Sequence, residues 1–182
     1  ISLKYLRSRF DAVCIACGAQ KPRDLNIQGR ELDGVYFAMD FLIRQNKKIS
    51  NETLDGGDIT VKGKHVLVIG GGDTGSDCVG TSIRQGASSV TQIEIMPKPP
   101  EQISESTPWP MWPYLLRTSS SHKEGCERLW NIMTKSFEGE KGKLKQARAV
   151  KVEWESDSLG RPTKMKEIPN SEFIIKAGAV FI

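Results

Sequence analysis

The apolar and polar positions in the middle of the chain predict a strand, a tight turn, a helix and a second strand. Residues 66–69 form a continuous apolar run, which is typical of a strand covered on both faces. From Thr74 onward the apolar residues follow helical spacing until Gly86, where the glycine predicts the end of the helix. A second strand over residues 90–95 follows at the distance expected for a βαβ unit.

The pattern before this central unit is less regular. In chain order it predicts the end of a helix, a short strand, an extended loop, a brief strand and a short helix, over residues 2–10, 11–16, 21–29, 34–36 and 38–45. A polar, glycine-rich connection over residues 51–58 then leads into the central unit.

A run of prolines after the second strand predicts a long loop between residues 97 and 113, because proline fits neither a helix interior nor a central strand. Trp109 and Trp112 lie within this loop, on a backbone that the prolines stiffen. Loops of this length are functional or disordered, and the aromatic residues argue against disorder. We expect a lid that covers a sheet edge, with a contact to a partner or cofactor as the alternative.

From Trp130 onward the pattern is antiparallel. Three strands separated by turns predict a β-meander over residues 132–137, 147–154 and 163–168. The last strand, residues 173–182, is expected to return to the parallel sheet. The predicted fold class is therefore α/β, a Rossmann-like parallel sheet with helices on both faces and an antiparallel β-meander excursion.

The glycine-rich turn of the central unit has the clearest chemistry. Gly70 allows the tight turn, Gly72 lets the backbone approach a pyrophosphate, and Gly75 lets the helix pack closely on the strand. The anion then lies on the free N–H groups of the first helical turn, where the helix dipole favours it. We predict that the whole turn contacts a dinucleotide, although a purely structural strand–turn–helix is an alternative. The remaining residues of the turn are Gly71, Asp73 and Thr74.

Glu94 lies in the second strand, about 20 residues past the glycines, where a carboxylate that binds ribose hydroxyls is expected. Such a carboxylate repels a 2′-phosphate, so the sequence favours NADH over NADPH. Lys98 is the counterargument, because its ammonium group could reach back across the proline turn and neutralise the phosphate. The expected ligand is NADH or NADPH, with NADH slightly favoured.

The composition predicts a soluble, cytoplasmic protein. The chain has 182 residues, enough for one large domain, and its net charge of +4 is spread along the sequence. The lysine-rich stretches contain no interleaved aromatic residues, so we expect no nucleic acid partner. No apolar run reaches the roughly 18 residues of a membrane span, and there is no signal-peptide pattern, so we expect no membrane association.

Cys14 and Cys17 form a CxxC pattern, a spacing found in metal and redox sites. They fall at a predicted strand, where residues three apart point to opposite faces, and no second pair completes four ligands. His65 and His122 have no partner at ligand spacing and are interpreted as ordinary surface or strand histidines. We therefore expect no metal site.

Both ends of the sequence look cut. The chain opens on Ile1 rather than on methionine, and it closes within the apolar run 177–182, which has the pattern of a buried strand. We therefore expect that the chain is a fragment of a longer polypeptide.

Several segments together resemble a known family. Residues 10–19 resemble the strand and turn with which two-dinucleotide flavoproteins re-enter their flavin domain, and residues 70–77 resemble their pyridine-nucleotide fingerprint. With residues 36–42, 97–100 and 108–113 added, nearly the whole chain is similar to the glutamate synthase small (beta) subunit. The tryptophan-proline segment is the most specific part of this resemblance.

The resemblance implies a domain division. Residues 1–36 would be a flavin-domain flank and connector, and residues 37–182 an NAD(P)H-binding domain truncated at its last strand. Gly18 would lie at the flavin-side turn, next to Cys17, which stands where the family usually has threonine. Asp77 matches an acidic position near the nicotinamide in related reductases, although a favourable place near the helix N-terminus explains it equally well.

The resemblance also implies an activity. Reduced nicotinamide would pass a hydride to FAD, and electrons would travel through iron–sulfur clusters to the glutamate synthase large (alpha) subunit, which forms glutamate from glutamine and 2-oxoglutarate. The iron–sulfur region and the main flavin-binding halves are missing from this sequence. We therefore expect this chain alone to hold no stoichiometric flavin, to have no catalytic acid, base or nucleophile, and to lack glutamate synthase activity.

Two alternatives stay open from the sequence. A sister flavoprotein, such as the reductase part of dihydropyrimidine dehydrogenase, would share the same architecture. A methyltransferase would use the turn at Gly70 for S-adenosylmethionine and Glu94 for its ribose, but the flavin-type signature around Gly18 argues against it.

Overall fold

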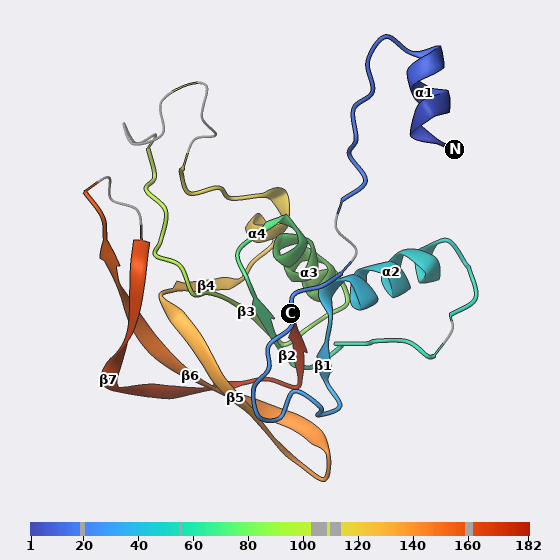
Figure 1. Cartoon of the computed structure of the whole chain (residues 1–182). Coiled ribbons are helices and arrows are strands. Elements are labelled where there is room, and N and C mark those ends of the chain that lie inside the picture. Colours follow the sequence, from blue (N-terminus) through green and yellow to red (C-terminus); the bar gives the residue numbers. More distant parts are fainter. Residues whose placement is uncertain (19–20, 55, 103–108, 110–113, 159–161) are drawn as a thin grey trace.

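The structure is a computed structural model that describes residues 1–18, 21–54, 56–102, 109, 114–158 and 162–182. Two β-sheets form the body of the molecule (Figure 1). The parallel sheet has the order β1-β8-β2-β3-β4, with the bounds Val35–Tyr36, Ala179–Phe181, His65–Ile69, Ser89–Glu94 and Glu127–Trp130. The antiparallel sheet has the order β5-β6-β7, with the bounds Ile132–Glu140, Lys143–Ser156 and Pro162–Lys176. The Rossmann-like α/β class is confirmed.

Four helices occur in the described part of the chain: α1 (Leu3–Arg9), α2 (Ala38–Ile49), α3 (Asp73–Arg84) and α4 (Ser120–Lys123). None of these helices has the length and apolar character needed to cross a membrane. Helix α2 extends beyond the predicted end at residue 45. Its last turn is mainly polar, so the apolar pattern stopped before the helix did. Lys47 and Lys48 in that turn interact favourably with the helix dipole.

Strand β2 is covered on both faces, and its side chains alternate between them. Val66 and Val68 face α2 and α3, in a core where the ring of Phe41 stacks on that of Phe181 with centroids 4.1 Å apart. Leu67 faces the antiparallel sheet. Each fully buried side chain of this size contributes roughly 1.5–3 kcal/mol. The sequence predicted helices on both faces of the parallel sheet. Helices α2 and α3 cover one face, whereas the antiparallel sheet covers the other.

The antiparallel sheet can cover that face because small residues line its inner side. Ala147 and Ala149 of β6 are fully buried, and Phe137 of β5 belongs to the same core. At the far end of β6 the Trp154 indole N–H donates to the carbonyl of Ile95 at 2.9 Å. The antiparallel sheet is therefore tied to the end of β3, where the candidate site begins.

The predicted return strand over residues 173–182 is wrong in its first half. Phe173 lies in β7 and pairs with Ala149, so the antiparallel sheet continues to Lys176. Only β8 joins the parallel sheet, where Val180 aligns with a residue of β1 on one side and a residue of β2 on the other. Gly178 marks the bend between the two sheets, and its N–H donates to the carbonyl of His65 at 2.8 Å.

Strand β4 and helix α4 were not predicted from the sequence. The antiparallel pattern was expected from Trp130, but Trp130 is the last residue of β4 and pairs with Glu94 in the parallel sheet. The antiparallel sheet begins two residues later, at Ile132. Asn131 has a positive φ of 58° and joins the two strands.

The predicted strand over residues 11–16 is not formed. Figure 1 shows this segment and α1 extending away from the two sheets, and α1 has no buried residue. Within the described part of the chain no strand pairs with this segment, so its backbone lacks the hydrogen bonds that define a strand. Cys14 and Cys17 are both exposed there. The predicted domain boundary at residue 36 stays a prediction, although β1 lies within the parallel sheet.

Candidate functional site

The glycine-rich turn leaves the carboxyl end of β2 and enters α3. Gly70 has a φ of +112°, which L-residues with a side chain rarely adopt, so glycine is needed there. Its N–H donates to the carbonyl of Ile93 at 2.9 Å, which holds the start of the turn against β3. Strand β2 lies between β8 and β3 in the sheet. In open α/β sheets, ligands bind at the carboxyl ends of strands where the connections change direction.

Gly72 and Gly75 have the two properties that the spacing predicts. A Cβ added to Gly72 would meet no atom within 4 Å, so the backbone there is open to a ligand. A Cβ added to Gly75 would lie 2.5 Å from the carbonyl oxygen of Gly70, so only glycine permits this close packing of α3 on the turn. No side chain caps α3 at Gly72, and its first N–H groups are therefore available to an anion.

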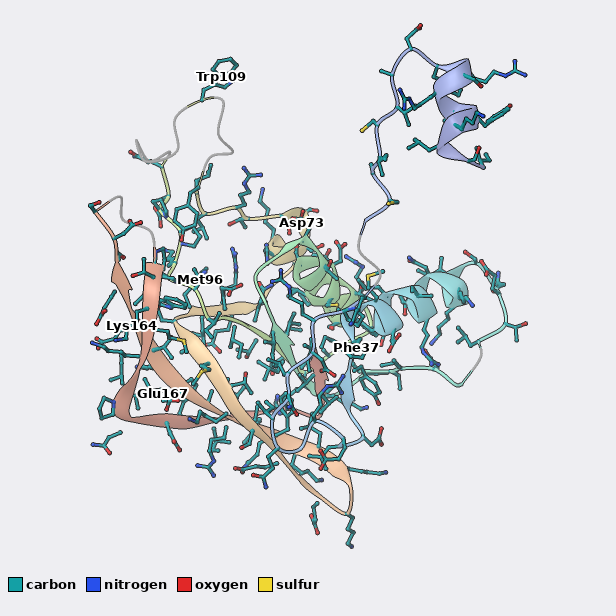
Figure 2. All side chains as sticks on the ribbon, viewed as in Figure 1. Phe37, Asp73, Met96, Trp109, Lys164 and Glu167 are labelled. Carbon is teal, nitrogen blue, oxygen red and sulfur yellow. The ribbon has the colours of Figure 1, made fainter. Side chains whose placement is uncertain are left out.

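Asp73 and Thr74 occupy the first turn of α3 and are exposed. Figure 2 shows Asp73 at the end of α3 that lies above the sheet. Asp77, one turn further along, is also exposed, but it lines neither of the two clefts beside the glycine-rich turn. The structure therefore brings Asp73 and Thr74 to the candidate site and leaves Asp77 outside it.

Glu94 ends β3 with its carboxylate against the glycine-rich turn. One carboxylate oxygen accepts the N–H of Gly71 at 2.6 Å, and the other accepts the N–H of Met96 at 3.2 Å. A Cβ added to Gly71 would come within 2.9 Å of the same carboxylate, so this glycine leaves space for it. The sequence placed a ribose-binding carboxylate here, and the structure holds a carboxylate fixed at that place.

Two clefts open on either side of the turn. The β4-side cleft, about 430 Å³ in volume, is bordered by six residues among others: Gly71, Glu94, Arg117, His122, Arg128 and Trp130. The β8-side cleft, about 660 Å³ in volume, is bordered among others by Phe37, Met39, Ile43, Thr74, Gly75 and Phe181, and by the charged residues Lys21, Arg23 and Asp40. Gly72 and Asp73 line both clefts. A ligand that crosses the turn can therefore enter both.

The β4-side cleft contains cations that the sequence analysis missed. The guanidinium of Arg128 lies 5.0 Å from the ring centroid of Trp130 and donates to the carbonyl of Arg117 at 3.2 Å. Lys98, which the sequence analysis named as the counter-charge to a 2′-phosphate, is paired with Glu101 at 3.1 Å and is not a lining residue of this cleft, although its ammonium lies 5.6 Å from the centroid of the Trp130 ring. Arg128 was missed because it lies on β4, a strand that the pattern did not predict.

A buried polar network also borders this cleft. The Gln92 side-chain amide donates to the carbonyl of Gly70 at 2.9 Å, and its oxygen contacts His122 Nε2 at 2.9 Å. His122 is buried in α4, so its interpretation as an ordinary surface or strand histidine is wrong, whereas His65 is exposed on β2 as expected. Burial, together with the charge of Arg128, lowers the pKa of His122 below its usual value.

Two further candidates lie away from the clefts. Gly18 has a φ of +67° and belongs to the extended segment that follows α1, where it lines neither cleft. Trp109 is 92 % exposed and projects away from both sheets (Figure 2). Its indole therefore covers no sheet edge, and the predicted lid itself falls mainly on residues 103–108 and 110–113, which lie outside the described residues. Trp112 lies outside the described residues.

Residues 4–159 match the family model described as pyridine nucleotide-disulphide oxidoreductase. The match includes both strands of the central unit, the glycine-rich turn between them, and α4 with His122. The methyltransferase alternative is not needed to explain the glycine spacing.

Two relatives are similar to the whole chain. The protein named glutamate synthase [NADH] from Schizosaccharomyces pombe is 44 % identical, and the chain covers 9 % of its length. The glutamate synthase [NADPH] small chain from Mycobacterium tuberculosis is also 44 % identical, and the chain covers 37 % of its length. The resemblance to the glutamate synthase small chain is confirmed. The chain nevertheless spans much less than half of either relative.

The fold is similar to that of a solved structure with low sequence identity. The Mycobacterium tuberculosis protein FprA in complex with NADPH has a TM-score of 0.57 and 19 % identity, over 100 % of this chain and 51 % of that one. This similarity supports the Rossmann-like architecture. The choice between NADH and NADPH cannot come from the relatives, because their names include both nucleotides.

Proposed function

Because this chain belongs to the pyridine nucleotide-disulphide oxidoreductase family, we propose that it binds NAD(P)H across the glycine-rich turn. The observation that carries this proposal is the open, uncapped start of α3 between two clefts. Gly72 leaves the backbone accessible, and the first N–H groups of α3 are free of side-chain caps. A pyrophosphate is an anion of the size and charge that such a helix start binds.

The two clefts would then receive the two halves of the dinucleotide. In the β4-side cleft, Glu94 would accept hydrogen bonds from ribose hydroxyls and Arg128 would contact the adenosine half. In the β8-side cleft, Phe37, Met39 and Phe181 offer an apolar surface to the nicotinamide ring. The bound reduced nicotinamide supplies a hydride, and the residues of this chain supply its binding and orientation.

We propose that NADH binds more tightly than NADPH. The Glu94 carboxylate is held beside the turn by two backbone N–H groups, and it would face a 2′-phosphate with a charge of the same sign. At 4 Å and an effective dielectric constant near 20, each charge pair costs roughly 4 kcal/mol. Salt and solvent exposure reduce this cost to about 1–2 kcal/mol. We therefore expect about a tenfold preference for NADH.

In the complete protein, this domain would deliver the hydride to FAD. Electrons would then pass through iron–sulfur clusters to a large (alpha) subunit that forms glutamate from glutamine and 2-oxoglutarate. Support for this larger role comes from the similarity to glutamate synthases over the whole chain. A sister flavoprotein with the same domain, such as the dihydropyrimidine dehydrogenase reductase part, is the second candidate.

Titration of the purified protein with NADH and with NADPH tests the binding proposal. We expect saturable binding of both, with NADH tighter, and loss of the preference in Glu94→Gln. The matched control is Glu153→Gln, the same change at an exposed carboxylate on β6, which should keep the preference. Absence of binding by either nucleotide overturns the proposed function. Tighter binding of NADPH overturns only the NADH preference and points to a cation beside the β4-side cleft, Arg117, Arg128 or Lys98.

A further inference from the structure

The turn that would hold the pyrophosphate is connected to a buried histidine by a chain of hydrogen bonds. The amide nitrogen of Gln92 donates to the carbonyl of Gly70, and the amide oxygen of Gln92 lies 2.9 Å from His122 Nε2. Gln92 is 2 % exposed and His122 is 9 % exposed. A buried polar side chain in the middle of a sheet is costly unless its groups are paired. Here both ends of the Gln92 amide have a partner.

The surroundings of the ring determine which nitrogen carries the proton. The backbone N–H of Ser119 points at His122 Nδ1 over 3.1 Å, so Nδ1 must accept a hydrogen bond. Nε2 must therefore carry the proton and donate it to Gln92. This donation orients the amide, with its oxygen toward His122 and its nitrogen toward Gly70. The Nε2–H group of His122 thus fixes the Gln92 amide with its N–H group toward the Gly70 carbonyl.

The same ring also holds α4 against α3. The hydroxyl of Ser119 accepts the N–H of His122, which closes a capping box with the Nδ1 contact. The Ser119 hydroxyl also contacts the hydroxyl of Ser76 in α3. One imidazole therefore connects the start of α4, a residue of α3 and, through Gln92, the first residue of the glycine-rich turn.

From this geometry, we propose that His122 is a positioning residue that acts through Gln92 to hold the glycine-rich turn in its ligand-binding shape, and that protonation of its ring weakens dinucleotide binding. The inference rests on the proposed function, because it concerns the same turn. Protonation places a hydrogen on Nδ1, where it opposes the N–H of Ser119. The Ser119 N–H then loses its acceptor and the capping box is weakened, whereas Nε2–H still donates to Gln92, so protonation acts on the glycine-rich turn through displacement of α4 and its ring rather than through loss of the donor.

Several charged groups surround the ring and set the pH at which this happens. Arg128 from β4 lowers the pKa of His122, in addition to the larger effect of burial. Asp73 from α3 and Glu94 from β3 carry the opposite charge and line the same cleft. Lys123 and Glu124 follow His122 in α4, and Glu124 is paired with Arg84 of α3. Because burial has the largest effect, the affinity should decline as the pH falls below the ordinary imidazole value of 6.5.

Calorimetric titration with NAD⁺, which tolerates acid better than NADH, tests the inference over a range of pH. We expect the affinity of the wild-type protein to fall several-fold, by less than about tenfold, between roughly pH 7.5 and pH 5.5, because the pKa of His122 lies below its usual value. His122→Gln keeps a donor toward Gln92 but cannot be protonated, so its affinity should not change over this range. The matched control is His65→Gln, a histidine exposed on β2, which should keep the wild-type fall.

Nuclear magnetic resonance of the wild-type ring gives a second readout that needs no variant. We expect the Nε2–H tautomer in the free protein, and a further decrease in the pKa of His122 when NAD⁺ binds. Persistence of the pH dependence in His122→Gln, a flat wild-type profile or an unchanged His122 pKa overturns the inference while nucleotide binding still stands. Absence of NAD⁺ binding at every pH overturns the proposed function and this inference together.

Discussion

The two clefts that meet at the glycine-rich turn differ in the chemistry of their walls. The β8-side cleft is bordered mainly by apolar side chains, including Phe37, Met39 and Phe181, and is the larger of the two. The β4-side cleft contains a fixed carboxylate, Glu94, and the guanidinium of Arg128. The same turn therefore separates a mainly apolar surface, which also includes Lys21, Arg23 and Asp40, from one that carries a fixed carboxylate and arginines.

This difference suits a ligand whose two halves differ in the same way. An adenosine half with ribose hydroxyls and possible phosphates needs oriented charges, whereas a nicotinamide ring needs a dry surface that leaves one face of the ring accessible. Sequence reasoning concentrated on the turn and on Glu94, and it therefore described only the charged half. If each cleft binds one half of the ligand, a substitution on one side of the turn should weaken the binding of that half alone.

The largest effect is expected from Phe41→Ala, on the apolar side. Phe41 is fully buried and stacks on Phe181, so its removal should lower the free energy of unfolding by about 3–5 kcal/mol. Because Phe181 also borders the β8-side cleft, NAD⁺ should bind more weakly while ADP-ribose, which lacks nicotinamide, binds unchanged. Urea unfolding and calorimetry measure the two effects. Equal weakening of both ligands would show that the clefts do not divide the dinucleotide.

Gly72→Val should remove binding on both sides of the turn. The added side chain would occupy the open space above the start of α3, and the affinity for NAD⁺ and ADP-ribose should fall at least about 100-fold, or about 2.7 kcal/mol. The unfolding transition should hardly move, because a Cβ there meets no atom within 4 Å. Gly75→Ala is the contrasting variant, because its Cβ collides with the Gly70 carbonyl and should destabilise the fold. A folded Gly72→Val protein with unchanged affinity would disprove the pyrophosphate assignment.

Arg128→Met should produce a smaller loss, confined to the charged side. The variant removes one of the two cations that lie over the Trp130 ring, the other being Lys98, and with it a positive charge that lines the β4-side cleft. ADP-ribose and NAD⁺ should therefore both bind a few times more weakly, and the effect should decrease at high salt. Measurement at two salt concentrations separates this charge effect from misfolding. A loss of affinity that salt does not alter would argue that Arg128 acts through packing alone.

The smallest effect is expected in the antiparallel sheet. Lys135 and Glu167 form an ion pair of 2.7 Å between β5 and β7, with both side chains partly exposed (Figure 2 labels Glu167). Lys135→Met should change the free energy of unfolding by less than about 1 kcal/mol and leave both ligands unaffected. Thermal unfolding measures the change in stability, and one NAD⁺ titration measures the change in affinity. A clear change in the affinity for NAD⁺ would mean that the antiparallel sheet is coupled to the clefts.

The sequence predicted those parts of the site that a single local constraint determines. The φ of Gly70 and the crowding at Gly75 exclude other residues, so their pattern is visible without any tertiary contact. The strand at residues 66–69 was similarly visible, because a strand covered on both faces must be apolar throughout. Asp77 was chosen from the family resemblance and Lys98 from its charge and its place just after the second strand, and neither side chain lines a cleft.

The parts that were missed depend on pairing between distant segments. Arg128 lies on a short strand at the sheet edge whose polar composition gives no strand pattern. His122 belongs to a four-residue helix, too short to produce a helical period. Gln92 offered a signal that was overlooked, because it follows Val90 on the same face of β3 and a polar residue on a core face requires a buried partner.

The position of β8 has a consequence for how the molecule folds. This strand follows β1 and β2 far along the chain, yet it lies between them and supplies β1 with its neighbour in the sheet. The parallel sheet can therefore close only after residues nearly 150 positions apart have met, since Val35 pairs with Val180. Such distant pairings slow folding, and until β8 arrives one edge of β2 stays open to other chains. During synthesis, the edge that carries the glycine-rich turn should therefore mature only after β8 has been made, and it is exposed to misassembly before then.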